Sequence, residues 1–170
     1  AAWQRTQDAG KTLAAMQEAA TSPHWRQLGI LTVEGTPLHH TGASCLDHCG
    51  GFEGTNSLAL GNFLGSADVL PEMVRAFEQA AGPLEERLQA GMLAGEAAGS
   101  EREPLQSAAL KVLGSEGLMD ADIRVDFSTD PLKDLRTLWL DWAPKAAAYR
   151  LRAIDPDAAP SSAEVEGRPA

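Results

Sequence analysis

A segment rich in histidine and cysteine is the densest group of chemically capable side chains in the sequence. It holds His39, His40, Cys45, Asp47, His48 and Cys49. Imidazole and thiolate groups are preferred ligands of Zn²⁺, and several of them in one loop can close a tetrahedral site. The Cys-x3-Cys spacing, however, lacks the second paired knuckle of a standard zinc finger. We therefore predict no metal and no cofactor here, and keep a zinc-stabilised loop as the weaker alternative.

The same segment offers Cys45 as a nucleophile with His48 as its base, because a thiol attacks only after an acceptor takes its proton. Packing is the more frequent explanation of a single cysteine after a strand, and we prefer it. Cys45 and Cys49 are the only cysteines of the chain. A disulfide scaffold would need a higher density of them, so we expect a reduced, cytoplasmic setting.

Gly61 and Asn62 follow a predicted strand, where a glycine lets the backbone approach a ligand closely. The Asn62 amide could donate a hydrogen bond to an oxyanion. Equally, Asn62 could form a turn in which its side chain bonds its own backbone. The glycine-rich stretch before it contains neither a GxGxxG nor a Walker sequence, so no nucleotide is predicted.

Asp122, Arg124 and Asp126 share one face of a predicted strand, because side chains alternate along a strand with a period of two. They could form a carboxylate–guanidinium site. An exposed edge with salt bridges is the more common explanation of such a pattern, and pairs of that kind contribute little stability. Gln106 and Ser107 open the preceding strand and could face a cleft.

The elements that must position these residues follow from apolar periodicity and from Gly and Pro breaks. We predict helices over 9–20, 66–81, 84–98 and from 130 onward, and strands over 27–33, 38–41, 55–60, 106–113 and 122–127. Residues 34–37 form a turn that makes the first two strands a hairpin, and 42–54 form a loop. Strands that cluster in antiparallel groups indicate an α+β layered domain rather than a doubly wound sheet.

Two helices have predicted inward faces. In the first, Val69, Met73, Val74 and Phe77 point inward, and in the second Leu84, Leu88, Met92 and Leu93 do so. The last helix carries a Trp-rich stretch over 139–149 that is typical of a core or of a homodimer face. Residues 155–170 hold Pro, Ala, Ser and acidic side chains, and we expect a disordered tail after a domain over 1–154.

The charge balance limits the classes of partner. With 24 acidic and 14 basic side chains in 170 residues, the net charge is −10. Nucleic acids and anionic membranes attract basic surfaces, so neither is an expected partner. No apolar run approaches the roughly 18 residues of a membrane span.

Several ordered motifs together resemble one family. Thr41-Gly42-Ala43-Ser44-Cys45 is the first, and stretches over 61–64, 69–78, 84–99, 106–110, 122–126, 130–135 and 152–157 follow at matching spacing. The chain thereby resembles an uncharacterised prokaryotic family related to the N-terminal-nucleophile hydrolases, domain of unknown function 1028. The resemblance implies an αββα sandwich of two antiparallel sheets between helical layers. It also implies a hydrolase whose N-terminal Thr, Ser or Cys attacks, with its own α-amine as the base.

On this resemblance we expect hydrolysis of a small non-peptide or cyclic amide C–N bond, with the nucleophile upstream of Ala1 and this chain inactive alone. Asn62 is the expected oxyanion donor, and Arg124 and Asp126 position the amide substrate. Gly61, Gln106 and Ser107 are the expected substrate-binding residues. The alternative is a non-catalytic binding or assembly module, which is favoured by departures from the family pattern at Leu60 and over 48–51.

Overall fold

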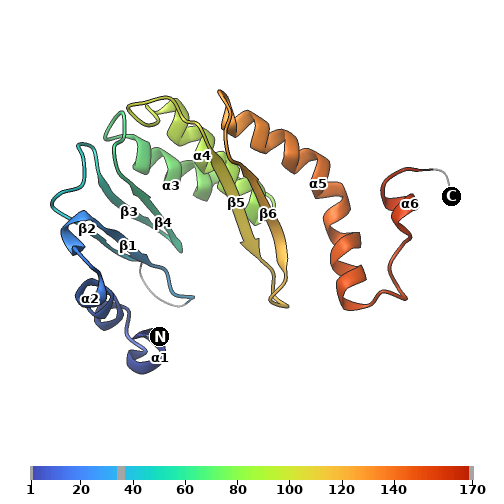
Figure 1. Ribbon diagram of the computed structural model, residues 1–170, viewed down its shortest axis with the longest axis horizontal. Coiled ribbons are helices and arrows are strands. Elements are labelled where there is room, and N and C mark those ends of the chain that lie inside the picture. Colours follow the sequence, from blue (N-terminus) through green and yellow to red (C-terminus); the bar gives the residue numbers. More distant parts are fainter. Residues whose placement is uncertain (1, 34–36, 169–170) are drawn as a thin grey trace. The chain divides into compact units, whose positions relative to one another are not determined.

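The computed structural model describes residues 2–33 and 37–168, which form two compact units, Ala1–Pro104 and Leu105–Ala170 (Figure 1). The first unit contains α1 (Ala2–Thr6), α2 (Ala9–Ala19), β1 (Gln27–Ile30), β2 (Leu38–Thr41), β3 (Gly50–Gly54), β4 (Ser57–Gly61), α3 (Val69–Gln79) and α4 (Leu84–Ala97). The second contains β5 (Ala108–Leu113), β6 (Met119–Val125), α5 (Pro131–Ile154) and α6 (Ser162–Val165). Small antiparallel sheets and helices together confirm the α+β class.

The first hairpin is formed by β1 and β2, which pair antiparallel from Gln27↔Thr41 to Ile30↔Leu38. This pairing confirms the predicted hairpin, although residues 34–36 of the expected turn lie outside the described residues. Helix α2 contacts both strands. It begins at Asp8, whose carboxylate accepts a hydrogen bond from the Lys11 amide at 2.9 Å and so satisfies one free donor of the first turn.

The second hairpin, β3 and β4, corrects the predicted loop over 42–54, which is too long. Residues 50–54 form β3, paired with β4 from Gly50↔Gly61 to Gly54↔Ser57. The three glycines of β3 hide the strand from propensity arguments, because glycine is depleted in strands. The hairpin turn is held from α3, where the Glu78 carboxylate accepts hydrogen bonds from the Thr55 amide and, at 3.2 Å, from the Ser57 hydroxyl.

The two hairpins of the first unit pack against each other (Figure 1). A Cβ at Gly29 would lie 2.8 Å from atoms of the Leu58 and Leu60 side chains, and a Cβ at Gly51 would lie 2.6 Å from the His39 ring. Side chains of each hairpin therefore rest on a glycine of the other. Glycine at these positions allows a closer approach than any other residue would permit.

Helices α3 and α4 lie on the side of the second hairpin away from the first (Figure 1). Their packing forms the core cluster of this unit, made of Ala59, Leu64, Val69, Leu70 and Val74. The layers of the unit are thus α2, the first hairpin, the second hairpin, and the α3–α4 pair.

The predicted inward face of α4 is wrong. Leu84 and Leu93 are 44% and 46% exposed, whereas Glu85, Gln89, Gly91 and Gly95 are buried. A Cβ on Gly91 would lie 3.0 Å from the Met73 carbonyl oxygen, and one on Gly95 would lie 2.6 Å from the Met73 side chain. Small residues, rather than leucines, therefore form the contact face because the two helix backbones run so close.

The second unit is built on the β5–β6 hairpin, which pairs antiparallel from Ala108↔Val125 to Leu113↔Met119. Helix α5 contacts both strands and begins at Pro131, in the first turn where a missing N–H costs nothing. The buried apolar side chains of this unit are Leu110, Val112, Ala121, Leu132, Leu135 and Trp139. No described helix is both long and apolar enough to cross a membrane.

The segment expected to be a disordered tail begins where α5 ends, at Ile154, and the structure places the short helix α6 within it. Ser161 and Glu164 form a capping box at the start of α6. Glu166 accepts a hydrogen bond from the Tyr149 hydroxyl at 2.7 Å and lies 3.3 Å from Lys145 Nζ. Polar contacts thus hold this segment against α5.

We expect acid to release this segment. The Tyr149 hydroxyl, followed by the Lys145 ammonium, holds the pKa of the Glu166 carboxyl below its ordinary value. A lowered folded-state pKa gives stability that is complete above the ordinary glutamate pKa, about 4.3, and is lost as the pH falls through the lowered value. The measurement is amide-exchange protection of Ser162–Val165 as a function of pH.

The control for this prediction is Glu166→Gln, which removes the titrating charge. It should lose part of the pH dependence and keep the share due to Glu164, whose pKa is lowered by Ser161. Wild-type protection that stays constant through the acid range would contradict the expectation.

Candidate functional site

The loop over 42–49 is fixed to the start of the first hairpin by backbone contacts. The Gly42 amide donates to the Arg26 carbonyl at 2.9 Å, and the Ser44 amide donates to the His24 carbonyl at 2.8 Å. A Cβ at Gly42 would lie 2.2 Å from the His24 carbonyl oxygen, so only glycine fits there. The Cys45 amide then donates to Gly42 at 3.0 Å and turns the chain.

Asn62 joins this loop to the end of β4. Its side-chain oxygen accepts a hydrogen bond from the Leu46 amide at 2.8 Å. Two residues further on, the Leu64 amide donates to the His48 carbonyl at 3.3 Å. Asn62 thus holds the backbone of a neighbouring loop and not that of its own turn. With its oxygen fixed, the Asn62 amide has a defined orientation, and its nitrogen is a donor with a defined direction.

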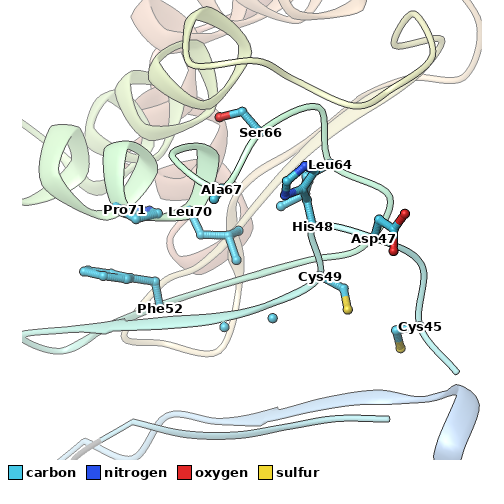
Figure 2. A pocket seen from close by; sticks show the side chains of 12 residues that line it. Cys45, Asp47, His48, Cys49, Phe52, Leu64, Ser66, Ala67, Leu70 and Pro71 are labelled. Atoms are coloured by element: carbon cyan, nitrogen blue, oxygen red, sulfur yellow. The ribbon is translucent and has the colours of Figure 1, made fainter. Parts of the chain in front are cut away.

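A cavity of about 460 Å³ lies beside this loop, between the second hairpin and the start of α3 (Figure 2). It is lined by Cys45, Asp47, His48, Cys49, Gly50, Gly51, Phe52, Leu64, Ser66, Ala67, Leu70 and Pro71. Gly61 borders it indirectly, because a Cβ there would lie 2.6 Å from Leu64 and 3.0 Å from Leu70. Thiol, imidazole and carboxylate groups meet apolar side chains in this space, which gives it the makings of a small-molecule site.

A second cavity, of about 640 Å³, carries less chemistry. It is lined by Trp3, Gln7, Thr12, Gly29, Ile30, Leu31, Thr32 and Val33. None of these side chains titrates near neutral pH. The cavity beside the 42–49 loop is therefore the candidate site of the first unit.

The histidines of the sequence cluster do not converge. His39 lies against Gly51, and its buried Nδ1 has no hydrogen-bond partner among the described residues. His40 Nε2 lies 3.2 Å from the Pro23 carbonyl oxygen, and His48 lines the cavity. Over residues 2–33 and 37–168, no three His, Cys, Asp or Glu side chains come together to hold a metal ion.

The remaining predicted site residues belong to the second unit and share one end of the β5–β6 hairpin. Arg124 Nε lies 3.2 Å from Asp126 Oδ1, with the two side chains 71% and 80% exposed. Gln106 adjoins the same end, because its carbonyl accepts the Ser128 amide at 2.9 Å. Ser107 is exposed and directly precedes β5. The Arg124–Asp126 pair therefore has the solvated form that the more common explanation describes.

Gln27 has a role that sequence reasoning missed. Its side-chain amide donates to the Gly61 carbonyl at 2.7 Å and to the Gly50 carbonyl at 3.1 Å, and lies 3.2 Å from the Thr41 hydroxyl. It thus ties β1 to both strands of the second hairpin, next to Asn62. A glutamine at the start of a strand carries no sequence signal for such a role.

The Asn62 anchor makes a prediction. Asn62→Ala removes the acceptor for the Leu46 amide, so we expect a loss of about 1 kcal/mol in the free energy of unfolding and faster exchange of that amide. Asn62→Asp keeps an oxygen acceptor and should stay close to wild type in both measurements. Equal effects of the two substitutions would show that the hydrogen bond does not hold the loop.

Comparison with known proteins places the chain. No curated protein matches its sequence. The crystal structure of protein SPO2555 from Silicibacter pomeroyi matches with a TM-score of 0.71 and 27% identity, over 79% of this chain and 59% of that one. The chain thus spans about three-fifths of the length of that protein. The model of the family described as "Family of unknown function (DUF1028)" matches residues 2–135, and the chain belongs to this family.

Proposed function

We propose that this chain forms part of an N-terminal-nucleophile-type amidohydrolase that cleaves the C–N bond of a small non-peptide or cyclic amide. The observation that carries the proposal is the layer order of the first unit, with two facing antiparallel hairpins between α2 and the α3–α4 pair. That order agrees with the αββα sandwich implied by the resemblance. Family membership supports the same fold but assigns no activity.

The proposed reaction needs a nucleophile that this chain does not supply, since Ala1 carries no nucleophilic side-chain atom. In the whole protein, a Thr or Ser hydroxyl attacks the amide carbon while its own α-amine takes the proton. The carbonyl oxygen then becomes negative. Electrostatic stabilisation of that oxygen requires a donor whose direction is set in advance.

Asn62 is the proposed oxyanion donor. Its oxygen is committed to the Leu46 amide, so the amide plane is set and the nitrogen points away from that bond. A donor held in this way costs no reorganisation when charge develops in the transition state. Arg124 and Asp126, with Gln106 and Ser107, remain the proposed substrate-positioning residues of the second unit. A homodimer through exposed apolar side chains of α5, such as Leu140, belongs to the same proposal.

A non-catalytic binding module is the second candidate, and a specific observation favours it. Arg124 and Asp126 pair with each other in solvent, which leaves neither group preorganised toward a substrate. The cavity beside the 42–49 loop can hold a small molecule whether or not a reaction follows. Under this reading Asn62 serves only to hold the loop.

The discriminating experiment compares the 170-residue chain with the same chain joined to an N-terminal extension that begins with Thr or Ser, against a panel of small linear and cyclic amides. We expect turnover only with the extension. In the extended protein, Asn62→Asp keeps the loop anchor but loses the donor, so kcat should fall by about 10²–10³-fold.

Two outcomes would decide against the hydrolase. Turnover by the unextended chain would show that the nucleophile lies within it. Calorimetric binding of an amide to the extended protein, with no product formed and no effect of Asn62→Asp, would favour the binding module.

A further inference from the structure

Two free thiols share the rim of the cavity beside the 42–49 loop, and the proposed hydrolysis uses neither. Cys45 is half-buried and Cys49 is exposed. Both line the cavity, and Figure 2 shows their sulfur atoms on the same side of the segment that joins them. Only three residues separate the two in the chain. A pair of thiols on one short segment and in one cavity can react with each other.

The loop is held on both sides of this pair. The Cys45 amide is bonded to Gly42, and the next amide, of Leu46, is bonded to Asn62. On the other side the His48 carbonyl accepts the Leu64 amide, and His48 has a φ of 50°, in the left-handed region. These bonds fold the segment back on itself and hold both cysteines at the cavity. A disulfide requires such a fold, because its Cα atoms lie about 4.4–6.8 Å apart.

We propose that Cys45 and Cys49 form a redox-active dithiol that closes to an intramolecular disulfide across the cavity rim. The oxidant is a hydroperoxide. The exposed Cys49 thiolate attacks the terminal peroxide oxygen, the O–O bond breaks, and Cys49 becomes a sulfenic acid while water or an alcohol leaves. The Cys45 thiolate then attacks the Cys49 sulfur, the S–O bond breaks, and a second water leaves. Two thiols lose two electrons and two protons in total.

Reversibility follows from the size of the ring. In the chain-entropy description, a disulfide stabilises a protein less when it closes a shorter loop. A bond between cysteines this close in sequence therefore adds little stability, and a dithiol reductant reopens it by thiol–disulfide exchange. The cavity thus has an open dithiol state and a closed disulfide state, and these differ at the loop that Asn62 anchors.

The test uses the 170-residue chain, treated with hydrogen peroxide and then alkylated with iodoacetamide under denaturing conditions. Before oxidation both cysteines should be alkylated. Afterwards neither should be, the intact mass should show the loss of two hydrogen atoms from a monomer, and a dithiol reductant should restore both alkylations. Tandem mass spectrometry should place the cross-link between Cys45 and Cys49.

Two matched variants test the order of attack. In Cys45→Ser the Cys49 sulfenic acid has no partner, so dimedone should trap it. In Cys49→Ser the half-buried Cys45 should give far less dimedone adduct. Retention of both alkylations in the oxidised wild type, a disulfide-linked dimer, or sulfinic acid without a cross-link would overturn the proposal. These outcomes are independent of amide turnover, so the proposed hydrolase can fail without affecting them.

Discussion

The side-chain amide of Gln27 joins the two hairpins of the first unit at the point where the candidate site begins. It reaches the carbonyls of Gly50 and Gly61, which face each other at the end of the second hairpin. Polar groups enclosed between packed layers are costly unless they are hydrogen-bonded. The contact therefore satisfies two carbonyls and fixes where β4 ends. Asn62, the 42–49 loop and the cavity beside it all follow from that position.

Glycine makes this arrangement sterically possible. Gly29 and Gly51 each lie beneath side chains of the opposite hairpin, and Gly91 and Gly95 admit α3 close to α4. Such close approach exchanges side-chain volume for backbone proximity. The chain consequently builds its site from backbone carbonyls, amides and one anchored asparagine, with the thiols and an imidazole at the rim of the cavity.

Much of the fold is predictable because its signals are local. The α2 and α3 helices, the first hairpin and the Pro131 start of α5 agree with periodicity, capping residues and Pro or Gly breaks. Strand β3 is not predictable in this way, because its glycines are typical of a loop and only pairing with β4 makes them a strand. The buried face of α4 is missed for a related reason, since backbone proximity to α3 outweighs the preference of leucine for the interior.

The site was predictable in its parts and not in its connections. The residue types and their place after a strand single out Asn62 and the cysteines. The partner of Asn62 is a backbone amide sixteen residues earlier, and Gln27 reaches carbonyls 23 and 34 residues away. Contacts of this kind depend on how the hairpins pack, which a periodic pattern does not encode.

The most direct test of this account is amide exchange in Gln27→Leu, which keeps a side chain of similar size and removes both donated hydrogen bonds. If Gln27 fixes the end of β4, exchange of the Leu46 amide, which Gln27 does not touch, should accelerate because Asn62 moves with that strand. Unchanged exchange at Leu46, with faster exchange confined to the strands that Gln27 bridges, would contradict the dependence of the site on this interaction.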